Sequence, residues 1–77
     1  MNDFVRLQMT QRVLVEGGMD TTLDARREGD QAVFSLSVDL HEQSPEAMAK
    51  LAQITSDNHF AFTVGKDNVA ALTLLDS

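Results

Sequence analysis

The sequence predicts a small α+β domain, a two-layer fold with a mostly antiparallel sheet and one helix packed on one face, in the chain order β-β-β-α-β-β. Four segments alternate apolar and polar residues with the period of two that marks a half-buried strand, and a fifth, at residues 69–75, is apolar on both sides. One segment, after Ser44-Pro45, has helical spacing instead. The connections are short, which suits antiparallel neighbours, and 77 residues suffice for one unit, so residues 1–77 are assigned to a single domain.

Residues 4–16 are expected to form a long strand. Its two faces alternate, and one of them carries mostly apolar side chains: Val5, Leu7, Met9, Val13 and Val15. Gln11 interrupts that face, which predicts a bulge or a bend there. Gly17-Gly18 follows and predicts a hairpin turn, because paired glycines supply the positive φ values that a tight turn needs.

Two further strands are expected at residues 19–27 and 32–41, joined by a turn at residues 28–30. The first has a low apolar content, which favours an edge of the sheet. The second alternates most cleanly, with four apolar residues facing inward: Phe34, Leu36, Val38 and Leu40. Its outward row is flat because the side chains are small and polar: Ser35, Ser37, Asp39 and His41. Such a row could receive a second sheet.

The helix is expected to begin at Ser44-Pro45 and to end near residues 56–58. Ser44 suits the N-cap, and proline suits the first turn because its ring presets φ. Two short strands follow at residues 59–64 and 69–75. The last strand is apolar on both sides, with Ala70, Leu72 and Leu74 facing one way and Val69, Ala71 and Leu75 facing the other.

A single helix cannot cover a five-stranded sheet, so the rest of the sheet must be polar or must meet a partner. The last strand is the expected contact, because an unpaired edge beside apolar side chains favours strand addition or dimerisation. The predicted partner or dimer interface consists of four residues: Val69, Leu72, Leu74 and Leu75. In an equally open alternative, Val69 and Leu75 fold under the N-terminal segment of the same chain.

The net charge of −6 is concentrated in the second half of the chain. From Glu28 onward there are eight acids and two bases, whereas the residues up to Arg27 are balanced. This distribution argues against direct nucleic-acid binding, which needs clustered bases, and suits a basic protein partner or simply solubility. Arg26-Arg27 is the one basic cluster. It could contact a carboxylate or phosphate on a partner, or pair with neighbouring acids.

No catalytic, cofactor-binding or metal-binding residue is predicted. The chain has no cysteine, which excludes disulfides, thiol nucleophiles and cysteine zinc sites. His41 and His59 are expected in separate loops, which disfavours a shared metal site. The serines lie in no nucleophile elbow, and the paired glycines lack the lysine and helix of a phosphate loop. Neither a signal segment nor a long apolar run is present, so no membrane association and a cytoplasmic location are expected.

These observations lead to the hypothesis of a non-enzymatic protein-binding module without a cofactor, forming a homodimer and occupying a surface of a basic partner protein. The alternative is a phage or mobile-element inhibitor, of the anti-defence or antitoxin type, that imitates the charge of DNA. That alternative requires the carboxylates to cluster on one face. A structural or assembly protein is a lesser alternative.

Overall fold

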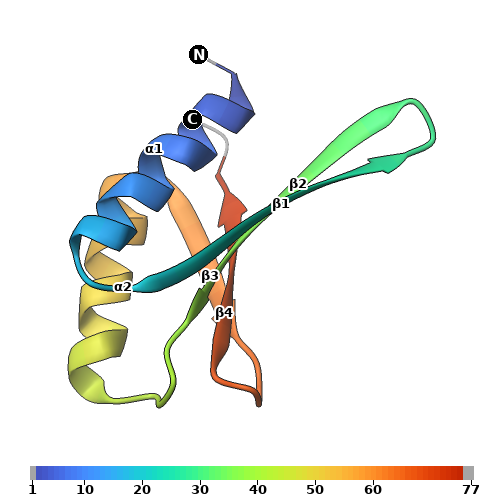
Figure 1. Cartoon of the computed structure of the whole chain (residues 1–77). Coiled ribbons are helices and arrows are strands. Elements are labelled where there is room, and N and C mark those ends of the chain that lie inside the picture. The colour runs from blue at the N-terminus through green and yellow to red at the C-terminus, as the bar shows by residue number, and fades with distance from the viewer. Residues whose placement is uncertain (1, 76–77) are drawn as a thin grey trace.

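A computed structural model of the chain describes residues 2–75 and contains four strands and two helices (Figure 1). The elements in chain order are α1 (Asp3–Glu16), β1 (Asp20–Glu28), β2 (Gln31–Asp39), α2 (Pro45–Asp57), β3 (Phe60–Val64) and β4 (Val69–Leu74). The strands form one sheet in the order β1-β2-β4-β3, and all neighbours are antiparallel. The predicted α+β class with an antiparallel sheet is confirmed, whereas the predicted order of five strands and one helix is wrong.

The error lies in the N-terminal segment, which is a helix rather than a strand. The side-chain oxygen of Asn2 caps it by accepting a hydrogen bond from the Val5 amide at 2.8 Å. Leu7, Thr10 and Leu14 are its buried residues, and their spacing is helical. The buried threonine interrupts the apolar stripe, and β-branched valines elsewhere imitate a strand pattern.

The paired glycines end this helix instead of making a hairpin turn. Gly18 adopts φ 84°, the left-handed conformation that follows many helices. Its amide donates to the Val15 carbonyl at 2.9 Å, and the Met19 amide donates to the Leu14 carbonyl at 3.0 Å. This pair of bonds is the Schellman motif, so the prediction of positive φ was correct at Gly18 while the element before it was wrong.

The other predicted helix and strands are present close to their expected positions. Ser44 caps α2, accepting a hydrogen bond at its hydroxyl from the Ala47 amide at 3.1 Å, and Pro45 begins the helix. β1 and β2 are joined by a two-residue turn in which Gly29 has φ 61°. β3 and β4 lie within one residue of their expected bounds.

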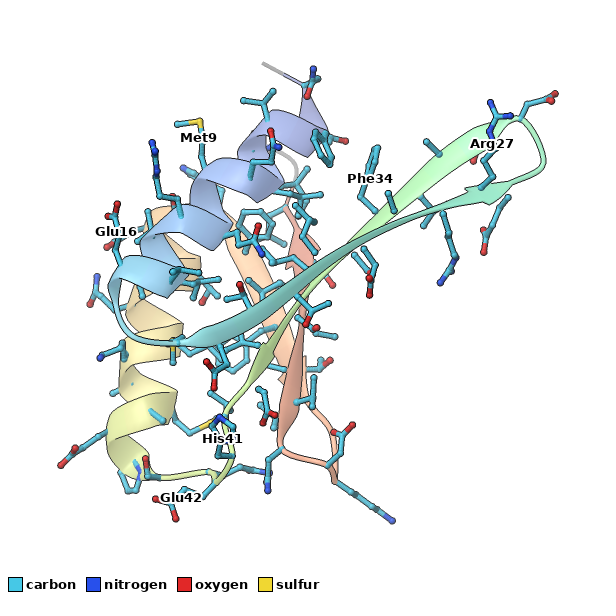
Figure 2. The ribbon with its side chains drawn as sticks, viewed as in Figure 1. Met9, Glu16, Arg27, Phe34, His41 and Glu42 are labelled. Carbon is cyan, nitrogen blue, oxygen red and sulfur yellow. The ribbon has the colours of Figure 1, made fainter. Side chains whose placement is uncertain are left out.

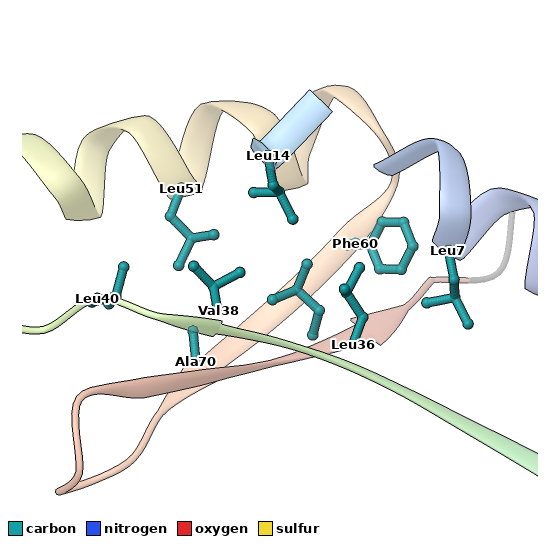
Figure 3. Packing of buried hydrophobic residues seen from close by; sticks show 9 residues of the cluster. Leu7, Leu14, Leu36, Val38, Leu40, Leu51, Phe60 and Ala70 are labelled. Carbon is teal, nitrogen blue, oxygen red and sulfur yellow. The ribbon is translucent and has the colours of Figure 1, made fainter. Parts of the chain in front are cut away.

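Both helices pack on the same side of the sheet, and the core lies between the two layers (Figures 1 and 3). The helices contribute Leu7, Leu14 and Leu51, which face the apolar strand residues that point toward them. The buried strand and loop residues of this core are Leu36, Val38, Leu40, Phe60, Ala70 and Leu72. Two helices therefore cover one face, and the other face has no covering layer in the part of the chain described.

β1 and β2 extend beyond the sheet as a two-stranded hairpin, here called the arm (residues 24–35; Figure 1). β2 pairs with β4 only through Leu36–Asp39, so the rest of β2 pairs with β1 alone. Phe34 marks the base of the arm, where its ring lies 4.8 Å from the ring of Phe4 on α1. This aromatic contact ties the arm to the helical layer.

The helical assignment of residues 3–16 predicts which substitutions destabilise the protein. Leu14 is fully buried, so Leu14→Ala should lower the free energy of unfolding by about 3–4 kcal/mol, because it opens a cavity between the helix and the sheet. Met9 is 53% exposed, so Met9→Ala should change the free energy of unfolding by less than about 0.5 kcal/mol. Urea denaturation measures both. A strand would place Met9 inward and Leu14 outward, so the reverse ranking would contradict the helix.

Candidate functional site

The four residues of the predicted interface do not form one patch. β4 lies between β2 and β3, so the expectation that the last strand is an unpaired edge is wrong. Leu72 points toward the helices and is only 9% exposed, and Leu74 beside it is half-buried. Val69 lies on the opposite side of the sheet, away from α1, and Leu75 is 44% exposed after the strand. Strand addition at β4 is therefore unavailable, and Val69 does not lie beneath the N-terminal segment.

The strand residues that point away from the helices form an uncovered side of the sheet, here called the open face. Most of its side chains on β2, β3 and β4 are short: Ser35, Ser37, Ala61, Thr63, Ala71 and Thr73. The register aligns one row across all four strands, made of Thr22, Ser37, Ala71 and Thr63. Since neighbouring strands are about 4.8 Å apart, this row of short side chains spans about 14 Å.

Part of this face was predicted from the sequence. Ser35, Ser37 and Asp39 lie on it as expected, but the chain turns away at His41, which adopts φ 59°. The alanines and threonines of β3 and β4 were missed as part of the same surface. In the sequence these two strands alternate small residues with large apolar ones. That alternation shows that the small residues share a surface with β2 only when the order and register of the strands are known.

Aspartates border the open face along β1 and β2. Asp20 and Asp39 are directly opposite each other in the register, and Asp24 lies further along β1. His41 contacts both of these aspartates, with its Nε2 atom 2.5 Å from a carboxylate oxygen of Asp20 and its Nδ1 atom 3.7 Å from one of Asp39. The hydrogen bond with Asp20, and then the charge of Asp39, raise the pKa of His41 above 6.5.

Asn68 holds the loop that carries His41. The side-chain nitrogen of Asn68 donates to the backbone carbonyl of His41 at 3.1 Å, and the backbone carbonyl of Asn68 accepts from the Leu40 amide at 2.9 Å. Gln43 adds a hydrogen bond to the Asn68 side-chain oxygen at 3.2 Å. Asn68 has φ 64°, which asparagine tolerates better than most residues. The turn between β3 and β4 therefore fixes the position of the cluster of Asp20, Asp39 and His41, here called the acidic corner.

A hollow of about 290 Å³ lies beside this corner, between the end of α1 and the start of α2. Its polar groups are largely engaged, because the Lys50 ammonium donates to the Gly17 carbonyl at 2.8 Å and Ser44 caps α2. His41 pairs with carboxylates rather than with a hydroxyl, so no nucleophile–base pair is formed here. Within residues 2–75 no group of three or more histidines and carboxylates, His41 with Asp20 and Asp39 included, is arranged so that it could hold a metal ion.

Arg26 and Arg27 are placed on opposite faces of the arm, because successive strand residues alternate. Arg26 pairs with Glu28 on the same strand, with 2.9 Å between its guanidinium nitrogen and the carboxylate. Arg27 lies near the tip of the arm, far from His41 and Glu42 at the opposite end of the molecule (Figure 2). The side chains of the two arginines therefore leave the arm on opposite sides.

Comparisons with protein-family models, with curated proteins and with solved structures found no match. No helix within residues 2–75 is long and apolar enough to cross a membrane. The cytoplasmic location expected from the sequence stays a prediction.

The two contacts of His41 predict an NMR titration. Its pKa should lie above 6.5 in the wild type and should fall further in Asp20→Asn than in Asp39→Asn, because the hydrogen bond to Asp20 is the larger cause. A raised pKa means that protonated His41 favours the fold. That contribution is complete below pH 6.5 and is lost as the pH rises through the raised pKa. An unchanged pKa in Asp20→Asn would contradict the contact.

Asn68 provides a second test of this corner. Asn68→Ala should lower the free energy of unfolding by about 1–2 kcal/mol, because it removes side-chain hydrogen bonds and strains the left-handed backbone. Asn68→Gly removes the same bonds but accepts the backbone conformation, so its loss should be smaller. Urea denaturation distinguishes the two. Equal stability of both variants and the wild type would show that the corner does not depend on Asn68.

Proposed function

We propose that the protein is a non-enzymatic protein-binding module whose open face contacts a basic partner protein. The observation that carries this proposal is a row of short side chains that lies beside an aspartate border on an uncovered sheet face. An antiparallel sheet commonly packs one side on the core and exposes polar residues on the other. Here β3 and β4 carry only alanine, threonine and valine on that side, which leaves room for a partner to approach closely.

The border gives the proposed contact its charge preference. Asp20, Asp24 and Asp39 are exposed at the edge of the open face, and positive charge there is limited to His41 and Arg26. Complementary fields speed encounter and select partners, while the row of short side chains supplies contact area. A basic protein is therefore the partner class that this surface fits.

The placement of the acids does not favour imitation of DNA. Seven of the eight acids of the second half lie within the described residues, and they occupy separate regions: Glu28 and Asp30 lie at the end of the arm, Asp39, Glu42 and Glu46 precede or begin α2, Asp57 ends α2, and Asp67 lies in the β3–β4 turn. The eighth, Asp76, lies outside the described residues. A phosphate-like row would need the acids along one surface. Local recognition by three aspartates is the better-supported mechanism.

Affinity capture with matched baits tests the proposal. The wild type and an Ala49→Arg control on the exposed surface of α2 should retain the same basic protein, whereas Ala71→Arg at the centre of the open face should lose it by at least about tenfold. Binding should weaken strongly at about 1 M salt, where the screening length falls to about 3 Å.

The outcome that contradicts the proposal is equally specific. Ala71 is exposed, so Ala71→Arg should keep the circular dichroism spectrum and the stability of the wild type. If the correctly folded Ala71→Arg bait retains the same partner as the Ala49→Arg control, the open face is not the binding surface.

A further inference from the structure

The outer edge of β1 is the longest unpaired strand edge in residues 2–75. β1 stands at the end of the sheet order and pairs with β2 over nine consecutive residues, without the bulge that often blunts an edge. It contains no proline or lysine, and residues 24–28 are exposed along the arm. β3 is the other edge strand, and it has only five residues.

The arm has a physical reason to gain a third strand. A two-stranded ribbon alone is at best marginally stable in water, and the arm lies beyond the helices, anchored at its base by Phe34 and Phe4 (Figure 2). A strand added to β1 would satisfy the backbone groups of its free edge. The question is which chain presents a complementary strand.

The turn of the arm determines which backbone groups are free. In a hairpin with a two-residue loop, the residues flanking the loop, Glu28 and Gln31, form a hydrogen-bonded pair, and such pairs then alternate along the ladder. Even-numbered residues of β1 therefore bond to β2. The amides and carbonyls of Leu23, Ala25 and Arg27 point outward to the free edge.

We propose that this edge pairs antiparallel with the same edge of a second copy of the chain, centred on Ala25. In this register Asp24 is opposite the partner's Arg26, and the two-fold symmetry repeats the pair. The outward groups of Leu23, Ala25 and Arg27 then meet their equivalents. Leu23, half-buried, lies beside the apolar stem of the partner's Arg27.

The charge pattern selects this register among its neighbours. A register centred on Asp24 places two aspartates opposite each other, and one centred on Arg26 does the same with two arginines while setting Asp24 against the partner's Glu28. Directly opposed like charges destabilise a strand pair, and opposed unlike charges stabilise it. The sequence of β1 is therefore complementary to itself when Ala25 is the centre.

This pairing makes one continuous sheet from two copies. Residues of equal parity face the same side, so both pairs of helices lie on one side and the two open faces join on the other. The inference goes beyond the proposed function and does not depend on it, because the contact uses the edge of β1. Of the residues proposed to meet a basic partner, it engages Asp24 and leaves Ala71 and Thr63 uncovered. It also replaces β4 as the dimer contact expected from the sequence.

Sedimentation velocity over a range of protein concentrations tests the inference with a charge exchange. The wild type should form a species of twice the mass of one chain. Asp24→Arg and Arg26→Asp should each raise the dissociation constant by about tenfold or more, because each places like charges opposite each other twice. The double variant that carries both substitutions should recover wild-type association. Glu42→Arg is the control, since it changes charge as Asp24→Arg does but lies in a loop outside the arm.

Three results would overturn the inference. A wild type that stays monomeric at every concentration excludes the self-pairing, and association that both single variants leave intact excludes this edge. Loss of association in both single variants without recovery in the double variant excludes the register centred on Ala25. Thermal denaturation of each variant separates lost pairing from lost folding. The Ala71→Arg variant should dimerise as the wild type does, so failure of partner capture and failure of self-pairing are distinguishable.

Discussion

The packing of two helices on one side of the sheet is the constraint on which the rest of the structure depends. Leu14 of α1 and Leu51 of α2, both fully buried, cover the inward residues of the strands. With one side of every strand committed to this core, the alternate residues are left on the other side. The same packing covers the sheet only as far as the helices reach, so the arm emerges as a ribbon without a covering layer.

Local signals made most of the fold predictable from the sequence. Ser44-Pro45 marked the start of α2, and strict alternation marked β2 and β3. The prediction for residues 3–16 was wrong because the buried stripe of the helix contains Thr10 in place of an apolar residue, while Val13 and Val15 are exposed. A period of two fitted this composition better than a helical period, and the packing that decides between them is not local.

The site was harder to predict than the elements, because it depends on strand order. The apolar residues on both sides of β4 were recognised as unusual, yet β4 is a central strand between β2 and β3 and not an unpaired edge, and Ala71 on its uncovered side is exposed. Ala71 is small and exposed, and it became part of a row only when the register aligned it with Ser37 and Thr63. His41 and Asp20 are 21 residues apart, and no spacing rule connects them.

The two proposed surfaces use the charges of the chain in different ways. Two copies that each carry −6 repel at long range, but the screening length of about 8 Å at physiological salt leaves close pairs to decide the contact. In the proposed dimer, Arg26 lies between Glu28 of its own strand and the partner's Asp24, so these two carboxylates neutralise its positive charge. Asp20 and Asp39 lie outside this contact, at the end of the sheet that His41 holds together. In the proposed dimer Asp24 is engaged by the partner's Arg26, so Asp20 and Asp39 are the aspartates of the border that stay outside the self-pairing and face a basic partner on the joined open faces.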